Sequence, residues 1–201
     1  MQIVLATRNP DKVKEIRNLL APFSIRVLSL SRFPGAPEVR EDGATLEANA
    51  IKKAHTIARF TRMWAIADDT GLEVDALGGR PGVRSARFAG PKAGYAENCE
   101  KLLRAMKEVP AKNRGATFRC VAAIASPERV IQIIQGRIRG RISLEAKGRG
   151  GFGYDPLFWV PARRKTFSEL GLAVKNKISH RARAFRKAGQ FLAKTSTEKS
   201  R

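Results

Sequence analysis

Residues 2–20 read QIVLATRNPDKVKEIRNLL, and this opening stretch indicates the fold class. Gln2–Ala6 is a short apolar run of the kind that forms a buried strand. Asn9 is a favourable N-cap, and Pro10 suits the first position of a helix. Apolar residues then recur at helical spacing as far as Leu20. The chain therefore opens as strand, turn and helix.

The rest of the chain alternates strands and helices at first and pairs strands later. We expect further strands at 25–30, 63–67, 116–125, 129–137 and 155–160, and further helices at 45–62, 95–107 and 177–194. Such an order predicts an α/β protein with a mixed β-sheet rather than a purely parallel one. We expect one domain over residues 1–194, followed by a flexible polar tail at 195–201.

Composition excludes several classes of protein. Of the 201 residues, 43% are hydrophobic and 28% are charged, which indicates a globular chain. The longest apolar run, residues 120–125, is too short to cross a bilayer, and the N-terminus lacks the basic start of a signal peptide. Two cysteines are too few for a disulfide framework. We therefore expect a cytoplasmic protein without membrane contact.

The charge is strongly unbalanced. Thirty-nine Lys and Arg face 18 Asp and Glu, a net charge of +21, which indicates a polyanionic partner: nucleic acid, an anionic membrane or a phosphorylated small molecule. Residues 38–75 differ, with eight acids against five bases. An acidic island in a basic chain suggests a divalent cation beside a phosphate-binding surface, or only a solvated acidic face.

Two stretches near the N-terminus carry candidate phosphate and metal chemistry. At residues 7–12 a helix N-terminus follows a strand, a geometry that binds phosphate, and Lys12 adds positive charge. Asp68 and Asp69 follow a buried strand, where neighbouring residues point to opposite faces. One carboxylate can then face a ligand, with Glu41 as a second ligand for Mg²⁺, while the other braces the structure. A simple turn is the alternative, because Asp and Gly favour turns.

Two later stretches suit recognition of a base. Residues 148–153, GRGGFG, match G-x-G-x-x-G, but no helix follows, so a dinucleotide fold is excluded. A glycine loop carrying Phe152 instead allows a planar base to approach the backbone and stack on the ring. Residues 175–181, KNKISHR, are rich in donors that suit an acceptor such as a purine O6, although a basic surface helix would look similar.

Together these stretches resemble the inosine triphosphate pyrophosphatase family over residues 3–190. The matching segments are LATRNPDKVKEI from residue 5, EDGATLEANAIKKA from 41, IADDTGLEVDALGGRPGVRSARFAG from 66, GGFGYDPLF from 150 and KNKISHRARA from 175. The resemblance implies an elongated α/β fold with flanking helices and two lobes around a central cleft. It also implies Mg²⁺-dependent hydrolysis of nonstandard purine triphosphates (ITP, dITP, XTP) to the monophosphate and pyrophosphate, usually by a homodimer.

The resemblance also assigns roles to individual residues. It places substrate phosphates at Thr7, Arg8, Asn9, Pro10, Asp11, Lys12 and Lys53. It makes Glu41 and Asp69 the metal ligands, with Asp69 also the catalytic proton acceptor, and it brings Thr70 into contact with substrate. It assigns base recognition to Phe152, Gly153, Tyr154, Asp155, Lys175, His180 and Arg181. Arg8 departs from the family, because bacterial members often have glycine there.

Donor chemistry gives a hypothesis for selectivity. Lys175, His180 and Arg181 supply mainly hydrogen-bond donors, which match the 6-keto group of inosine or xanthine and leave adenine's 6-amino group unmatched. Two alternatives remain. A Maf-like nucleotide pyrophosphatase would open with an S-x-S-x-R-R type motif, which residues 7–9 lack. A nucleic-acid-binding protein would suit the charge but leaves the acidic island unused, so the charge permits nucleic-acid contact that we do not expect.

Overall fold

The computed structural model describes residues 1–198, with only the backbone of Glu198. Its strands are β1 (Gln2–Leu5), β2 (Arg26–Ser29), β3 (Ala65–Val74), β4 (Pro81–Gly82), β5 (Gly115–Ala125), β6 (Val130–Ile142), β7 (Phe158–Val160) and β8 (Lys165–Thr166). Its helices are α1 (Pro10–Leu20), α2 (Leu46–Thr61), α3 (Tyr95–Ala105), α4 (Gly171–Ile178) and α5 (His180–Glu198). Short 3₁₀ turns connect several of these elements.

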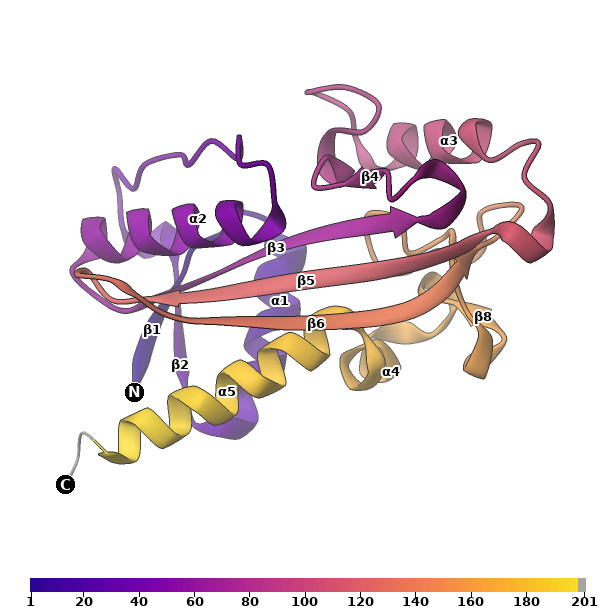
Figure 1. The fold of residues 1–201 in the computed structure, drawn as a ribbon. Helices are drawn as coiled ribbons and strands as arrows, with labels where there is room; N and C mark the ends of the chain where they lie inside the picture. The colour runs from indigo at the N-terminus through magenta and orange to yellow at the C-terminus, as the bar shows by residue number, and fades with distance from the viewer. Residues whose placement is uncertain (199–201) are drawn as a thin grey trace. The chain divides into compact units, whose positions relative to one another are not determined.

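The strands form one sheet in the order β2-β1-β3-β5-β6-β7-β8, with β4 paired to β3 (Figure 1). Strand β1 runs parallel to β2 and β3, whereas β4 is antiparallel to β3 and β7 is antiparallel to β6 and β8. The predicted mixed α/β sheet is therefore confirmed. Within the described residues, no helix is both long enough and apolar enough to cross a membrane.

The chain divides into two compact units that share three strands. Unit 1 comprises residues 1–69, 120–136 and the described residues from 180 onward, and unit 2 comprises residues 70–119 and 137–179. Strands β3, β5 and β6 each have one end in unit 1 and the other in unit 2. The assignment of residues 1–194 to a single two-lobed domain stays a prediction.

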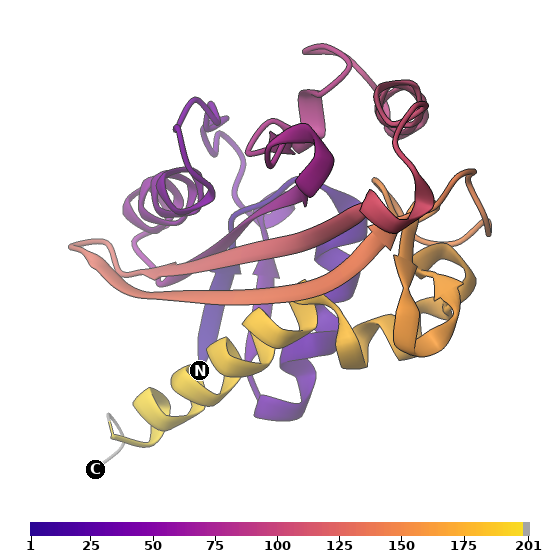
Figure 2. The ribbon, with the colours of Figure 1, turned by 45° about the vertical axis from the view of Figure 1, so that its right-hand side comes forward.

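Unit 1 has its core between the sheet and the helices α1 and α5. Ile16 and Leu20 of α1 meet Phe185 and Leu192 of α5 over buried strand residues such as Ile66. Figure 2 shows α5 along one face of the sheet and α2 on the opposite face. Unit 1 thus buries both faces of its part of the sheet.

Unit 2 has a separate core that is rich in aromatic residues. The rings of Phe118, Phe158 and Phe167 pack with centroids 4.6–6.1 Å apart. Leu102 and Met106 of the α3 region are fully buried in the same cluster. Such ring pairs add about 0.5–1.5 kcal/mol each beyond the area that they bury.

Strand β3 is longer than the sequence predicted, and this corrects the position of Asp68 and Asp69. We expected a strand at 63–67 that ended at these residues, but β3 runs on to Val74 and places both aspartates mid-strand. The residues after them, TGLEV, are mostly buried and pair with β4, so sheet pairing overrides the turn preference of Asp and Gly.

The final helix also differs from the prediction of one helix over 177–194. It is two helices, because Ser179 has an extended backbone (φ −66°, ψ 161°) that ends α4 before His180 begins α5. Helix α5 continues to Glu198, four residues into the segment 195–201 that was expected to be a flexible tail. The rest of that tail, 199–201, lies outside the described residues.

Candidate functional site

The turn from β1 to α1 is capped by Asn9, as predicted. Its side-chain oxygen accepts hydrogen bonds from the amides of Asp11 (2.9 Å) and Lys12 (3.2 Å), and its own amide donates to Thr7 Oγ1 (3.2 Å). Pro10 begins the helix. Arg8 donates to the carbonyl of Ala36 at 2.6 Å, so it anchors the loop before α2. The side chain of Lys12 is therefore the charge that this turn offers to a ligand.

Asp68 and Asp69 point to opposite faces of β3. Asp68 lies 3.2 Å from Lys12 Nζ of α1 and 3.2 Å from Arg181 Nη2 of α5. Asp69 lies 3.7 Å from Lys53 Nζ and accepts a hydrogen bond from Asn49 Nδ2 (3.0 Å), both from α2. This alternation is the one expected for adjacent residues of a strand, and the separate roles of the two carboxylates stay a prediction.

Lys53 connects the acids on the α2 side of the sheet. Its ammonium group lies 2.5 Å from Glu41 Oε1 and donates to the main-chain oxygen of Asp68 at 2.7 Å. Asn49 precedes Lys53 by four residues, so the two share a face of α2. Its side-chain oxygen also accepts from the amide of Gly43 (2.8 Å), which holds the loop that carries Glu41. Sequence reasoning missed Asn49, although its spacing from Lys53 was a usable signal.

The two aspartates have opposite pKa shifts. Burial by itself would raise the pKa of Asp68, but Lys12 and Arg181 outweigh it and hold that pKa well below its usual range. Burial raises the pKa of Asp69 and the nearby Glu41 raises it further, while Lys53 only partly offsets them. Asp68 is thus fixed as an anion, and Asp69 is the carboxylate able to take up a proton.

Arg181 joins three elements of unit 1 through buried ion pairs. It donates from Nη1 to Glu15 Oε2 of α1 (2.6 Å) and from Nε and Nη2 to Asp68 Oδ2 of β3 (3.3 and 3.2 Å). Burial opposes its charge, but both acids raise its pKa. Its neighbour His180 is buried at the start of α5. Glu15 was not predicted from sequence, because a glutamate on an amphipathic helix reads as solvent-facing.

Unit 2 holds Phe152 beside a buried ion pair. Lys175 Nζ lies 2.6 Å from Asp155 Oδ2, with each side chain 3% exposed, and 4.5 Å from the Phe152 ring centroid. The same Asp155 oxygen accepts from the amide of Phe152 (2.9 Å). Gly151 has a φ of +78°, and a Cβ there would lie under 3.0 Å from the Asp155 carboxylate. The glycine loop therefore wraps closely around Asp155, and the ion pair fixes the ring.

The other predicted residues of unit 2 make structural contacts. Tyr154 is buried and donates its hydroxyl to the Ser85 carbonyl (2.9 Å), while the Gly153 carbonyl accepts from Cys99 Sγ (3.3 Å). Thr70 is half-buried directly after Asp69 in β3. Tyr95, which the sequence did not single out, lies 5.9 Å from Phe152 between ring centroids.

The structure thus gathers the predicted residues into one set in each unit. In unit 1, Asp68 contacts Lys12, Lys53 and Arg181. Lys53 also contacts Glu41 and Asp69. Within the described part of the chain, no group of three or more His, Cys, Asp or Glu side chains is placed to hold a metal ion. Glu41 and Asp69 nevertheless supply two carboxylates around one ammonium group, and an all-oxygen pair fits Mg²⁺, which keeps several waters.

Comparisons of the sequence and of the structure with known proteins point to the same family. Residues 3–191 match the profile of the Ham1 family. A dITP/XTP pyrophosphatase of Desulforamulus reducens is 53% identical over 96% of both chains, and one of Bacillus subtilis is 44% identical over 95% of this chain and 96% of its own. A HAM1 protein structure from Coxiella burnetii superposes with a TM-score of 0.87 at 38% identity, covering 96% of this chain and 99% of that one. The family predicted from the five segments is confirmed.

Proposed function

The chain belongs to the Ham1 family, and we propose that it hydrolyses nonstandard purine nucleoside triphosphates such as ITP, dITP and XTP to the monophosphate and pyrophosphate. The Asp68–Asp69 pair is the observation that carries the proposal. One carboxylate is locked as an anion by Lys12 and Arg181, and the other has a raised pKa beside Lys53 and Glu41. Relatives at 44–53% identity are named dITP/XTP pyrophosphatases.

In the proposed mechanism Asp69 accepts a proton from the water that attacks phosphorus. A P–O bond to that water forms, the P–O bond to the leaving pyrophosphate breaks, and the proton goes to Asp69. Burial raises the pKa of Asp69 in the metal-free chain, and a carboxylate at this position can act as a general base. Asn49 and Lys53 hold its carboxylate in place.

Positive charge in unit 1 offsets the charge of the triphosphate. Asp68 fixes the ammonium group of Lys12 at 3.2 Å, so this cation does not have to be ordered when substrate arrives. We propose that Glu41 and Asp69 hold Mg²⁺, which when bound supplies further charge neutralisation on phosphate oxygens. Thr7 and the first turn of α1 complete the proposed phosphate site.

We propose that residues of unit 2 recognise the base. Phe152, fixed by the Lys175–Asp155 pair, offers a ring face for stacking of a purine. We propose that Lys175 favours a 6-keto over a 6-amino group, because adenine would leave its donor unmatched. The guanidinium group of Arg181 is instead buried and paired with Glu15 and Asp68 in unit 1. We also propose that the protein forms a homodimer and is located in the cytoplasm.

A pyrophosphate-release screen over common and deaminated triphosphates, with and without Mg²⁺, tests this function. We expect kcat/KM for dITP and XTP to exceed that for ATP by at least about 100-fold, and chelation of Mg²⁺ to abolish turnover. Equal rates with ATP and ITP would contradict the donor argument. Neither alternative, a Maf-like enzyme or a nucleic-acid-binding protein, is favoured by the comparisons.

A further inference from the structure

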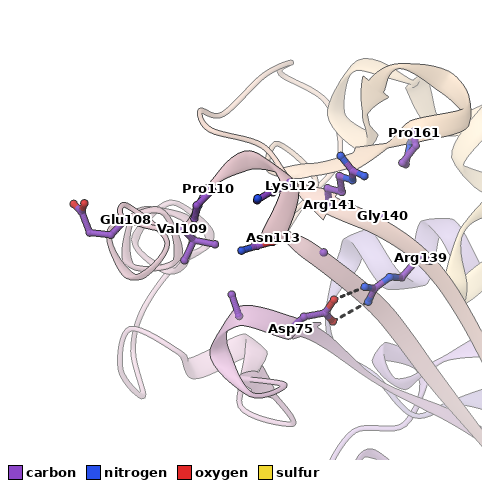
Figure 3. A pocket seen from close by; sticks show the side chains of 12 residues that line it. Asp75, Glu108, Val109, Pro110, Lys112, Asn113, Arg139, Gly140, Arg141 and Pro161 are labelled. Atoms are coloured by element: carbon purple, nitrogen blue, oxygen red, sulfur yellow. Dashed lines mark hydrogen bonds and ion pairs between the residues drawn. The ribbon is translucent and has the colours of Figure 1, made fainter.

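Unit 2 contains a cavity of about 800 Å³ that shares no residue with the proposed substrate site (Figure 3). It lies among the 3₁₀ turns Asp75–Leu77 and Ala111–Asn113, strand β6 and Pro161. Cavities that bind small molecules measure about 300–1,000 Å³, so this one is large enough for a ligand of mononucleotide size.

Three basic side chains line this cavity. Arg139 is held by Asp75 through both carboxylate oxygens, and its Nη1 also donates to Thr117 Oγ1 at 3.2 Å. Lys112 and Arg141 have no ion-pair partner among the described residues. The carboxylate of Glu108 lies at the outer edge of the cavity and points away from Lys112 (Figure 3). The cavity therefore has a positive lining with two cations available to an anionic ligand.

Arg114 adds positive charge behind the cavity wall. Its guanidinium group donates to the carbonyls of Met106 (2.6 Å), Val109 (3.2 Å), Ile142 (2.9 Å) and Ser143 (3.0 Å). The residue is 3% exposed, and no carboxylate is among these partners. Because Val109, Asn113 and Gly115 of the same segment line the cavity, this uncompensated cation strengthens the positive potential within it.

We propose that this cavity binds a small molecule bearing two or more phosphate groups. Arg141 presents a planar guanidinium group that can hold phosphate oxygens through two hydrogen bonds, and Asp75 orients Arg139 in the same lining. Lys112 supplies a further charge from the turn Ala111–Asn113. Val109, Pro110 and Pro161 provide an apolar surface for the remainder of the ligand.

Calorimetric titration of the full chain with inorganic tripolyphosphate tests the proposal. We expect one site in addition to the substrate site. The double variant Lys112→Gln/Arg141→Gln should weaken that additional site at least about tenfold, because it removes two charges and their charged hydrogen bonds to the ligand. The matched control is Arg163→Gln/Lys165→Gln, which removes the same charge from exposed positions of unit 2 outside the cavity. It should change the affinity less than about twofold, within the range of surface substitutions.

A second variant separates the effect of the cavity's volume on binding from the effect of its charge. Ala76→Trp places a large side chain in the cavity lining without changing net charge, and it should remove the additional site while dITP turnover is retained. A single site in the unmodified chain, equal weakening by both double variants, or unchanged binding by Ala76→Trp would overturn the proposal. Loss of dITP hydrolysis in the unmodified chain would contradict the proposed function alone, because the count of anion sites does not depend on turnover.

Discussion

Asp68 and Asp69 are adjacent in the sequence, yet their environments shift their pKa values in opposite directions. The cause is strand alternation: one side chain meets Lys12 and Arg181, and the other is buried near a second acid, Glu41. Two chemically identical side chains therefore differ in their properties. Asp68 holds cations in place, and Asp69 is the proton acceptor of the proposed mechanism.

Replacing Asp69 by Asn should separate activity from stability. The variant loses the base, and we expect kcat for dITP to fall at least about 100-fold. Because the pKa of Asp69 is raised, its charged form is disfavoured by folding, so the variant's melting temperature should equal or exceed that of the unmodified chain. Turnover assays and thermal denaturation check both expectations. Near-normal turnover would remove Asp69 from its role.

Replacing Asp68 by Asn should have the opposite effect on stability. It leaves the buried charge of Arg181 undercompensated, and we expect a loss of about 3–5 kcal/mol in the free energy of unfolding. The folded-state pKa of Asp68 is depressed, so its stabilisation is complete above the unfolded value of about 3.9 and is lost as pH falls through the lower folded value.

Denaturant unfolding at several pH values provides the measurement for Asp68→Asn. The difference in the free energy of unfolding between the unmodified chain and Asp68→Asn should be constant from pH 7 to about 5. It should become smaller below about pH 4. A difference that stays constant down to pH 3 would mean that Asp68 is not held by its cations. The Asp69→Asn variant serves as the control, because its free energy of unfolding should differ from that of the unmodified chain with the opposite sign.

At the scale of elements, helix α5 depends on a glycine in the strand beneath it. A Cβ at Gly136 of β6 would lie under 3.0 Å from the backbone of both His180 and Ala184. These are backbone atoms, which cannot rotate away as a side-chain end could. The absence of a side chain at Gly136 thus sets how closely the start of α5, with His180 and Arg181, approaches the sheet.

Gly136→Ala should therefore destabilise the protein and disturb its activity together. We expect a loss of about 1–3 kcal/mol in the free energy of unfolding, the usual range for overpacking, and a rise in KM for dITP. Gln132→Ala, at an exposed position of the same strand, is the matched control and should change neither quantity appreciably. Unchanged stability of the Gly136 variant would show that α5 does not rest on this residue.

Sequence patterns predicted some elements better than others, for physical reasons. The cap at Asn9 and the helices α1, α2 and α3 carry local signals, and these were predicted correctly. The length of β3 depends on pairing with distant strands, and the break at Ser179 has no proline or glycine to mark it. Likewise the roles of Glu15 and Asn49 depend on contacts with Arg181 and Asp69, which are 166 and 20 residues away in the sequence. No local sequence pattern contains such contacts.

At the scale of the whole molecule, the net charge of +21 opposes compaction. Both units contribute, because unit 2 alone has 20 Lys and Arg against 8 Asp and Glu. Because 39 Lys and Arg outnumber 18 Asp and Glu, the acids cannot pair with all of the cations. Repulsion among them acts over distances that salt can screen, since the Debye length is about 10 Å at 0.1 M.

Added NaCl should therefore stabilise this protein. We expect the melting temperature to rise between 10 and 150 mM NaCl, because the repulsion that is screened outweighs the few exposed ion pairs that are weakened with it. Thermal denaturation at constant pH measures the effect. Repeating the series near pH 10.5, where exposed lysines are partly neutral, should reduce the rise. A melting temperature that falls with salt at neutral pH would mean that attractive pairs, not net charge, dominate the electrostatics of this chain.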